Sequence, residues 1–290
     1  MTERRFKLAK PLCVTVVSAI LPLAGIALAA VSPRNVGIAS AVVNDVRISP
    51  ANTPKPHRAA LRERVALADN VQTGQRSELQ VLLLDKSVFT VGANARLTID
   101  RFVYDPSGNH AFGASIAKGA FRFMSGRPDH EGDSSINTPI ATIGIRGTII
   151  DGVVGDDAIG IAKLETAIDP DVKSDPQTAS LIVLRGPGQQ TQGSTIAGAI
   201  SVTAGGKTVL LDRPMLAAYV PAPGMVPIGP FFISRGGLAR INSLLFPLVA
   251  ERRVARERAS KSPFQFRIGL PLPIFGGGQD SEPQSPRKGR

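Results

Sequence analysis

Residues able to carry out chemistry are few in this sequence and widely spaced. The histidines His57, His110 and His130 lie in segments rich in Pro and Gly, and none forms an HxxxH or HxH pair. The chain has no G-x-S-x-G elbow, P-loop or G-x-G-x-x-G turn. A carboxylate pair for glycoside cleavage, assembled from distant strands, is left open. We therefore predict that the protein has no catalytic residues and no cofactor and is not an enzyme.

The densest group of possible metal ligands is Asp129-His130-Glu131-Gly132-Asp133. It lacks the longer alternating spacing of a calcium loop, so we expect a solvated hairpin tip and no bound metal. Asp151, Asp156 and Asp157 surround Gly152 and Gly155, a pattern that predicts a turn. The polar segment 189–195 (QQTQGST) is either a site for sugar hydroxyls or simply a soluble loop.

Composition excludes several classes of protein. The single cysteine, Cys13, excludes a disulfide framework and a thiolate zinc site. The chain is 290 residues long, and its aromatic content is only 5% with no Trp, which argues against a stacking surface for single-stranded nucleic acid. The net charge of +11 lies mostly at the two ends, since residues 30–250 carry a net charge of only +3. We therefore expect no nucleic-acid partner.

The N-terminus has the pattern of an export signal. Residues 1–12 are basic, and residues 13–30 carry no charge and end in Ala27-Leu28-Ala29, the small-x-small pattern of a signal-peptidase site. We predict cleavage after Ala29 or Ala30, and a mature protein in the periplasm or secreted. The alternative is an uncleaved anchor, because 18 apolar residues approach the length of a membrane span. Such an anchor would be the chain's only contact with the membrane.

The body of the chain, from Val36 to about Val220, has the pattern of β-strands. Residues 95–100 (ARLTID) alternate with period two, which is typical of a half-buried strand. Residues 79–84 (LQVLLL) predict a strand covered on both faces. Residues 119–126 place Phe121 and Phe123 on one face between two glycines. Further runs occur at 140–154, 180–185, 195–203 and 207–220, the last two forming a hairpin around Gly205-Gly206.

We therefore predict an all-β fold, with no amphipathic helix before about residue 236. Periodicity does not choose among stacked sheets, a β-sandwich and an irregular β-solenoid. Residues 49–57 hold three prolines and predict an extended excursion. The pattern of residues 237–259 predicts a helix that Pro247 breaks or kinks. The composition of the last dozen or so residues predicts a disordered basic tail.

Six segments of the chain occur in a familiar order: residues 36–44, 65–74, 77–85, 88–99, 118–126 and 137–148. They resemble, in this order, those of the FecR domain, the periplasmic module of iron-dicitrate sensors. The last is the most specific, NTPIATIGIRGT, and resembles the family's TP-x-A-x-x-G-x-RGT signature. The signature residues are Thr138, Pro139, Ala141, Gly144, Arg146, Gly147 and Thr148. The resemblance covers about residues 36–155.

The signature segment also has a physical interpretation of its own. Pro139 fixes the entry into a strand, and Gly144 and Gly147 allow a close backbone approach or a bulge. Arg146 and Thr148 are expected to satisfy loop carbonyls rather than to bind a ligand. About a dozen residues precede the apolar run, too few for a cytoplasmic sigma-binding segment, so the family's anti-sigma function is not expected here.

These expectations divide the chain into a signal peptide (1–30), a FecR-type β domain (31–225), a helical or extended segment (226–268) and a disordered tail (269–290). A small second domain from about residue 175 is the alternative. The resemblance implies a non-catalytic envelope protein of a Gram-negative bacterium, which binds an envelope or membrane protein, or a glycan, by β-augmentation or surface contacts. The alternatives are a sensor acting through a separate membrane regulator, and a calcium-dependent carbohydrate-active enzyme.

Overall fold

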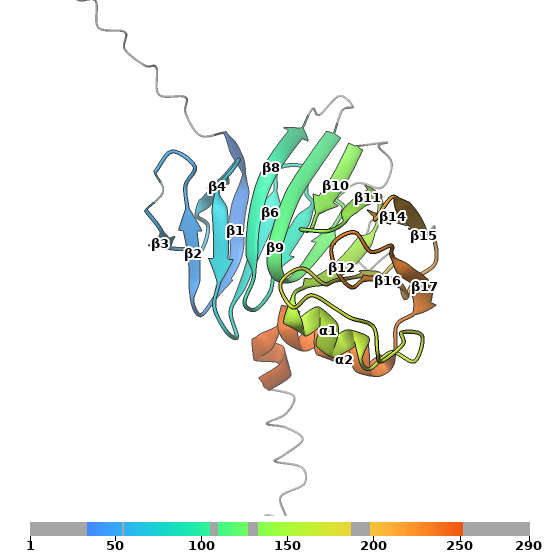
Figure 1. The fold of residues 1–290 in the computed structure, drawn as a ribbon. Coiled ribbons are helices and arrows are strands. Elements are labelled where there is room, and N and C mark those ends of the chain that lie inside the picture. The colour runs from blue at the N-terminus through green and yellow to red at the C-terminus, as the bar shows by residue number, and fades with distance from the viewer. Residues whose placement is uncertain (1–33, 54, 105–109, 127–132, 187–197, 252–290) are drawn as a thin grey trace, which may run out of the picture.

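The computed structural model describes residues 34–53, 55–104, 110–126, 133–186 and 198–251, and the fold is all-β as predicted (Figure 1). Two sheets pack face to face. In spatial order, the strands of the first, sheet A, are β4 (Arg64–Ala66), β1 (Asn35–Val43), β6 (Glu78–Leu83), β7 (Val88–Val91), β9 (His110–Met124), β12 (Ile149–Val154), β13 (Ser180–Leu184), β16 (Leu216–Val220) and β17 (Ile228–Phe232).

The second sheet, sheet B, faces sheet A across the core. Its strands, again in spatial order, are β3 (His57–Arg58), β2 (Val46–Ser49), β5 (Asn70–Thr73), β8 (Arg96–Tyr104), β9, β10 (Asp133–Asn137), β11 (Thr142–Arg146), β14 (Ala199–Ala204) and β15 (Lys207–Leu211). Neighbouring strands are antiparallel in both sheets, except that β9 and β10 are parallel.

Strand β9 belongs to both sheets and joins them. Its first part pairs with β8 and β10 in sheet B, and from Gly119 onward it pairs with β7 and β12 in sheet A. Gly119 makes the crossing with φ of 89°, a conformation that side chains disfavour. Most of the segment 119–126 is therefore the second half of a long strand, which passes from one sheet to the other at Gly119.

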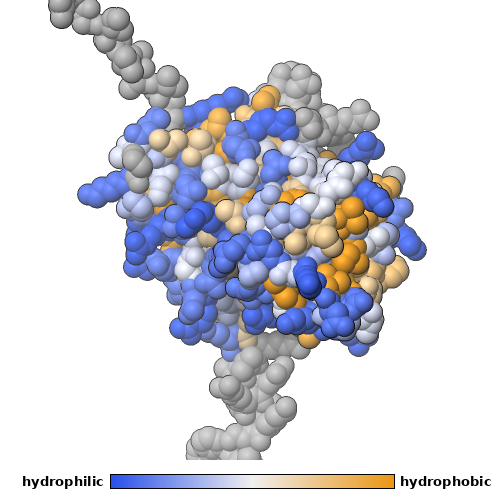
Figure 2. All heavy atoms as spheres, viewed as in Figure 1, coloured by the Kyte–Doolittle hydropathy of each residue, from blue (hydrophilic) through white to orange (hydrophobic). Residues whose placement is uncertain are grey.

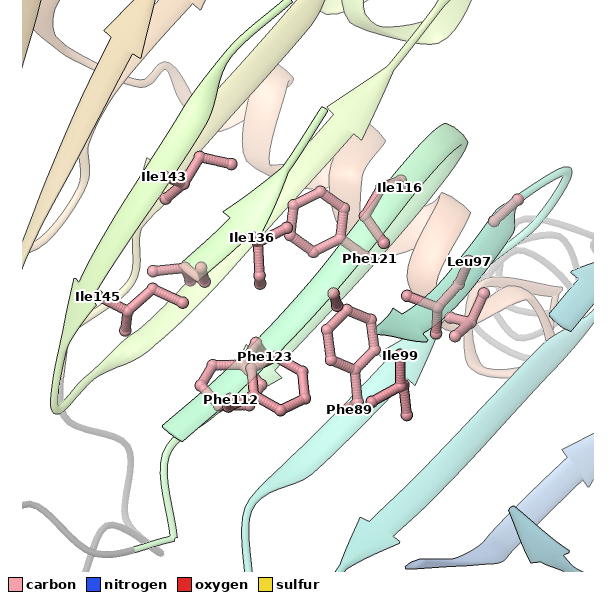
Figure 3. Close-up of a cluster of buried hydrophobic side chains, with 14 of the residues drawn as sticks. Phe89, Leu97, Ile99, Phe112, Ile116, Phe121, Phe123, Ile136, Ile143 and Ile145 are labelled. Carbon is pink, nitrogen blue, oxygen red and sulfur yellow. The ribbon is translucent and has the colours of Figure 1, made fainter. Parts of the chain in front are cut away.

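The core between the sheets is built from the inward-facing residue of each period-two pair. Phe112 and Phe123 stack with ring centroids 4.6 Å apart, and the centroid of Phe89 lies 5.9 Å from that of Phe121 (Figure 3). Phe89 comes from β7 and the other three from the two halves of β9. Offset aromatic pairs of this kind contribute about 0.5–1.5 kcal/mol each beyond the area they bury. Phe121 and Phe123 do share one face, as their spacing predicts.

Two helices cover the outer face of part of sheet A (Figure 1). Helix α1 (Asp156–Ala162) and helix α2 (Arg235–Leu245) pack on β12, β13 and β16 in a second hydrophobic core. Strands β12, β13 and β16 are consequently buried on both faces. Strand β6 was predicted to be covered on both faces, which is wrong: Leu79, Val81 and Leu83 point inward, whereas Leu82 is 38% exposed, because neither helix reaches this end of the sheet.

Helix α1 contradicts two sequence predictions, that Asp156 and Asp157 form a turn and that no helix precedes residue 236. Its buried residues are Ala158, Ile161 and Ala162, a spacing of three and four residues that fits a single short helical face. Only seven residues carry this pattern, too few to stand out beside the strands.

Helix α2 begins where its cap predicts and ends before proline. Ser234 Oγ accepts a hydrogen bond from the amide of Gly237 at 3.0 Å. The helix ends at Leu245, and a further helical segment follows at 247–251. The predicted break at Pro247 is therefore confirmed, while the rest of the predicted helix and the basic tail lie outside the described residues.

The predicted hairpin at Gly205-Gly206 is confirmed. Ala204 pairs with Lys207, and the two glycines have φ of 53° and 76°, values that a two-residue hairpin turn requires. The excursion at 49–57 likewise returns to β2 through the short strand β3, with Ile48 opposite His57. Strands β13 to β16 extend the same two sheets that hold β9 to β12.

Candidate functional site

The outer faces of the two sheets differ in what covers them. Helices α1 and α2 contact strands β9, β12 and β13 on the sheet A side, and apolar residues gather over the part of the surface near β16 and β17 (Figure 2). In the described part of the chain, no helix packs on the outer face of sheet B. This face is therefore the broad open surface of the sandwich.

A row of short polar side chains crosses the outer face of sheet B, one from each strand from β2 to β15. Each residue is the direct cross-strand partner of the next: Ser49, Asn70, Thr98, Ser115, Asn137, Thr142, Thr203 and Thr208. We call these eight residues the polar ladder. Because cross-strand partners share a face and the flanking residues Ile48, Leu97, Ile136 and Val202 are buried, the polar ladder points outward.

The polar ladder is partly tied together by its own hydrogen bonds. Asn70 Nδ2 donates to Thr98 Oγ1 at 3.1 Å, Thr142 Oγ1 donates to Asn137 Oδ1 at 3.0 Å, and the hydroxyls of Thr203 and Thr208 lie 2.8 Å apart. Its members are half-buried or exposed, with Thr142, Thr203 and Thr208 the most open. The hydroxyls of Ser115 and Thr142 already donate their one hydrogen but can still accept, and the amide of Asn70 has a second N–H to donate. The row can therefore bind a polar ligand.

A hollow lies beside the polar ladder, over β11 and β14. Gly144 and Ser201 are cross-strand partners that form its floor, and Arg146 and Leu210 line it as well. Its volume is about 390 Å³. A Cβ on residue 144 would lie 2.6 Å from Ser201 Oγ, so the absence of a side chain at Gly144 keeps the hollow open. Leu210 is 56% exposed at its rim, on edge strand β15.

Basic residues flank the polar ladder on both sides. On one side Arg47, Arg96 and Lys118 lie in a single cross-strand row with Gln72. On the other side are Arg101, which donates to Ser135 Oγ at 3.3 Å, and Arg146. Asp100 also lies on this face and accepts a hydrogen bond from the hydroxyl of Ser115. Arg47 pairs with Asp45 at 3.4 Å, and Arg96 and Lys118 line a hollow that also holds Asp156 and Asp157. The face thus has a neutral polar centre, and its margins carry both charges with basic side chains the more numerous.

The first half of the family signature forms the turn between β10 and β11. The amide of Thr138 donates to the carbonyl of Ala141 at 2.8 Å, and the amide of Ala141 donates to Thr138 Oγ1 at 3.0 Å. Pro139 occupies the second position of this turn, where its fixed φ is favourable. Thr138 Oγ1 also accepts from Ser180 Oγ at 3.0 Å. Since Ser180 lies on β13, this hydrogen bond ties the turn in sheet B to sheet A.

The second half of the signature carries the chain from sheet B to sheet A. Gly147 has φ of 45°, and Thr148 is buried with an Oγ1 that has no hydrogen-bond partner in the described part of the chain. Arg146 is exposed at the end of β11, and its guanidinium forms no ion pair with a described residue. Gly144 and Arg146 alone reach the open face; Thr138, Pro139, Ala141, Gly147 and Thr148 shape turns.

The other candidate residues do not come together. His57 Nε2 contacts Glu63 Oε1 at the surface, and His110 begins β9. His130 and the cluster from Asp129 to Gly132 lie outside the described residues, as does segment 189–195, and Asp133 is the first residue of β10. Across the part of the chain that the structure describes, no three His, Cys, Asp or Glu side chains are grouped as a metal ion would require.

A buried ion cluster was not foreseen from the sequence. Asp151, predicted to lie in a turn, is instead on β12 with a fully buried side chain. Its carboxylate accepts two hydrogen bonds from Arg122 on β9, at 2.6 and 2.8 Å, and lies 3.4 Å from Arg185 Nε. Arg122 also lies under the ring of Phe246, 5.1 Å from its centroid. The cluster thereby anchors the end of α2 to sheet A.

The pKa values of the two arginines of this cluster are shifted in opposite directions. Burial acts to lower the pKa of Arg122, but hydrogen bonding to Asp151 and its charge outweigh burial, so the pKa is raised. Burial lowers the pKa of Arg185, and the attraction of Asp151 offsets only part of that effect. The pairing with Asp151 is therefore centred on Arg122, and the cluster is structural: it lies under α2, away from the open face of sheet B.

Comparison with known proteins identifies a matching family. Residues 69–186 match the family described as FecR protein, a range that begins later and ends later than the resemblance seen in the sequence. No curated protein matches the chain. In the described residues, no helix has the length and apolar character needed to cross a membrane.

Two solved structures are similar to this chain. Both are crystal structures of a protein from Parabacteroides distasonis ATCC 8503 assigned as an anti-sigma factor, at 2.50 and 1.65 Å resolution. Each is 12% identical to this chain, with TM-scores of 0.39 and 0.37. The similarity covers 59% of this chain and 62% and 63% of theirs, so the chain spans less than two thirds of either protein.

Proposed function

Because the chain contains a FecR domain over residues 69–186, we propose that it is an exported, non-catalytic protein of the cell envelope that binds its ligand through the open face of sheet B. The FecR family is regulatory and non-enzymatic, which supports a role in sensing rather than in catalysis. The domain division and signal peptide given above are part of this proposal, with residues 31–225 as the binding unit.

The observation that carries the proposal is the open face itself. It combines the continuous polar ladder, the hollow floored by Gly144 and Ser201, and basic margins, on a rigid two-sheet scaffold. Binding sites are commonly concave and carry a few convergent polar groups on such a scaffold. Two residues of the signature, Gly144 and Arg146, line the hollow.

Filling the hollow tests this proposal. Tagged wild-type protein and a Ser201→Tyr variant are expressed in cells, crosslinked while the cells are intact, recovered and analysed by mass spectrometry. We expect the wild type to enrich one reproducible envelope component, and the enrichment to be at least about tenfold lower with the variant. A tenfold loss corresponds to only about 1.4 kcal/mol of binding free energy, which a tyrosine side chain that fills the hollow should easily cost.

An Arg64→Tyr variant is the matched control. Arg64 is exposed on edge strand β4 of sheet A, so it adds the same side chain away from the proposed face. Equal losses for the two variants, or an undiminished enrichment with Ser201→Tyr, would overturn the assignment of this face. Circular dichroism of both purified variants confirms that each remains folded.

A further inference from the structure

We propose that the polar ladder is a binding track for an extended acidic polysaccharide, a β-1,4-linked glycan whose sugar units carry carboxylates. This inference rests on the proposed function and specifies its ligand class. It is carried by three features of the described residues: the repeat of the polar ladder, the chemistry of its side chains, and the charge along its margins.

The repeat of the polar ladder is set by the sheet. Adjacent strands lie about 4.8 Å apart, so one hydroxyl or amide recurs at that interval from Ser49 to Thr208. This interval is close to the length of one sugar unit in an extended β-1,4-linked chain. A glycan running across the strands therefore meets one polar side chain per unit, over a run of several units.

The chemistry of the polar ladder also suits sugar hydroxyls. Ser and Thr hydroxyls donate one hydrogen bond and accept others, and Asn amides do both, as sugar hydroxyls do. These side chains are short, and some are already held by hydrogen bonds to one another, such as Thr203 with Thr208. Binding consequently costs little side-chain ordering.

The margins add selectivity for negative charge. Arg96 and Lys118 are exposed on one side of the polar ladder and Arg146 on the other. Carboxylates at the edges of the sugar rings would lie against these side chains, and one such group fits the hollow beside Arg146. The acidic residue Asp100 on this face is already engaged by the Ser115 hydroxyl.

A protein ligand fits this face less well than a glycan. The strands from β2 to β14 are hydrogen-bonded on both sides, so no strand of a partner can be added along the polar ladder. Protein interfaces also rely on buried aromatic and apolar anchors. The polar ladder contains none, and Leu210 lies only at its edge.

Binding measurements with two polysaccharides test the inference. The probes are β-1,4-linked polymannuronate oligosaccharides, which carry a carboxylate on each unit, and neutral cello-oligosaccharides of the same length. Isothermal titration is carried out on protein purified from cells that express the full chain. We expect polymannuronate to bind at least about tenfold more tightly than the neutral polymer. Its binding should also weaken as the salt concentration is raised, because the Debye screening length shortens to about 3 Å at 1 M.

Two variants separate the contributions. Thr142→Val/Thr203→Val/Thr208→Val removes hydroxyls but keeps the branched shape that strands favour, and is expected to weaken polymannuronate binding at least about tenfold, equivalent to some 0.5 kcal/mol for each hydroxyl. Arg96→Gln/Arg146→Gln is expected to abolish the preference for the charged polymer. Thr166→Val, at an exposed threonine after α1, is the control and should bind as the wild type does.

Three results would overturn the inference: no binding of polymannuronate, equal binding of both polymers, or binding that the triple variant retains. The proposed function can still stand in each case, because the crosslinking experiment with Ser201→Tyr reads dependence on this face whatever the ligand. A protein captured there in a Ser201-dependent way, with no polysaccharide binding, would identify a protein ligand instead. If no polysaccharide binds and the crosslinking does not depend on Ser201, the open face of sheet B is not the binding surface.

Discussion

Replacing Asp151 with asparagine is expected to lower the free energy of unfolding by about 3–5 kcal/mol, the cost of breaking a buried ion pair. The side chain of Asp151 is fully buried, and the exposed fractions of Arg122 and Arg185 are only 18% and 19%. Without the carboxylate, both guanidinium groups stay buried with no opposite charge. The melting temperature should fall by roughly 10 °C for a domain of this size.

Asp157→Asn provides the comparison for this measurement. Asp157 accepts a hydrogen bond from Arg240 at 2.8 Å, but Arg240 is 53% exposed. An exposed pair contributes at most about 1 kcal/mol. Urea denaturation of both variants checks the difference, and a loss below about 1 kcal/mol for Asp151→Asn would show that the cluster does not stabilise the junction of α2 with sheet A.

Gly119→Ala is expected to destabilise the protein by about 3 kcal/mol or more, from overpacking together with backbone strain. An added Cβ would lie 2.4 Å from Ala95 Cα, and φ at this position is 89°. Because the obstacle is backbone, β8 and β9 would have to separate where β9 passes from one sheet to the other. A large loss of stability would show that the close approach at this crossing helps to hold the two sheets together.

Gly206→Ala is the control for Gly119→Ala, because it tests the effect of a positive φ without a steric clash. Gly206 has φ of 76°, but nothing lies within 4 Å of the position of an added Cβ. Its substitution should cost only about 1 kcal/mol. If denaturant midpoints shift equally for the two variants, the close approach of β8 and β9 at Gly119 contributes nothing.

Much of the fold follows from local pattern. The alternation at 95–100 predicts Leu97 and Ile99 on one face of a half-buried strand and Thr98 on the other, and the burial of Leu97 and Ile99 confirms it. The glycine pair at 205–206 located a hairpin because its turn requires positive φ. Such features depend on neighbours in the sequence, so one chain suffices to predict them.

The candidate site depends on register, which local pattern does not contain. Thr98 could be assigned to an outer face, but its alignment with Ser115, Asn137 and Thr142 follows from pairings between distant strands. The contact of Asp151 with Arg122 could not be predicted either, because the two residues lie 29 positions apart in the sequence and meet only through the pairing of β12 with β9. Gly144 and Arg146 were singled out through the family signature, although Gly144 was expected to allow a close backbone approach or a bulge and Arg146 to satisfy loop carbonyls.

Site-specific photocrosslinking in intact cells tests the central claim, that the open face of sheet B is the ligand-binding surface, most directly. A photoreactive residue replaces Thr203, in the polar ladder, or Thr166, the exposed control after α1. We predict that position 203 yields one reproducible adduct with an envelope glycan or protein and that position 166 yields none. Equal adducts at both positions, or an adduct at 166 alone, would contradict the claim.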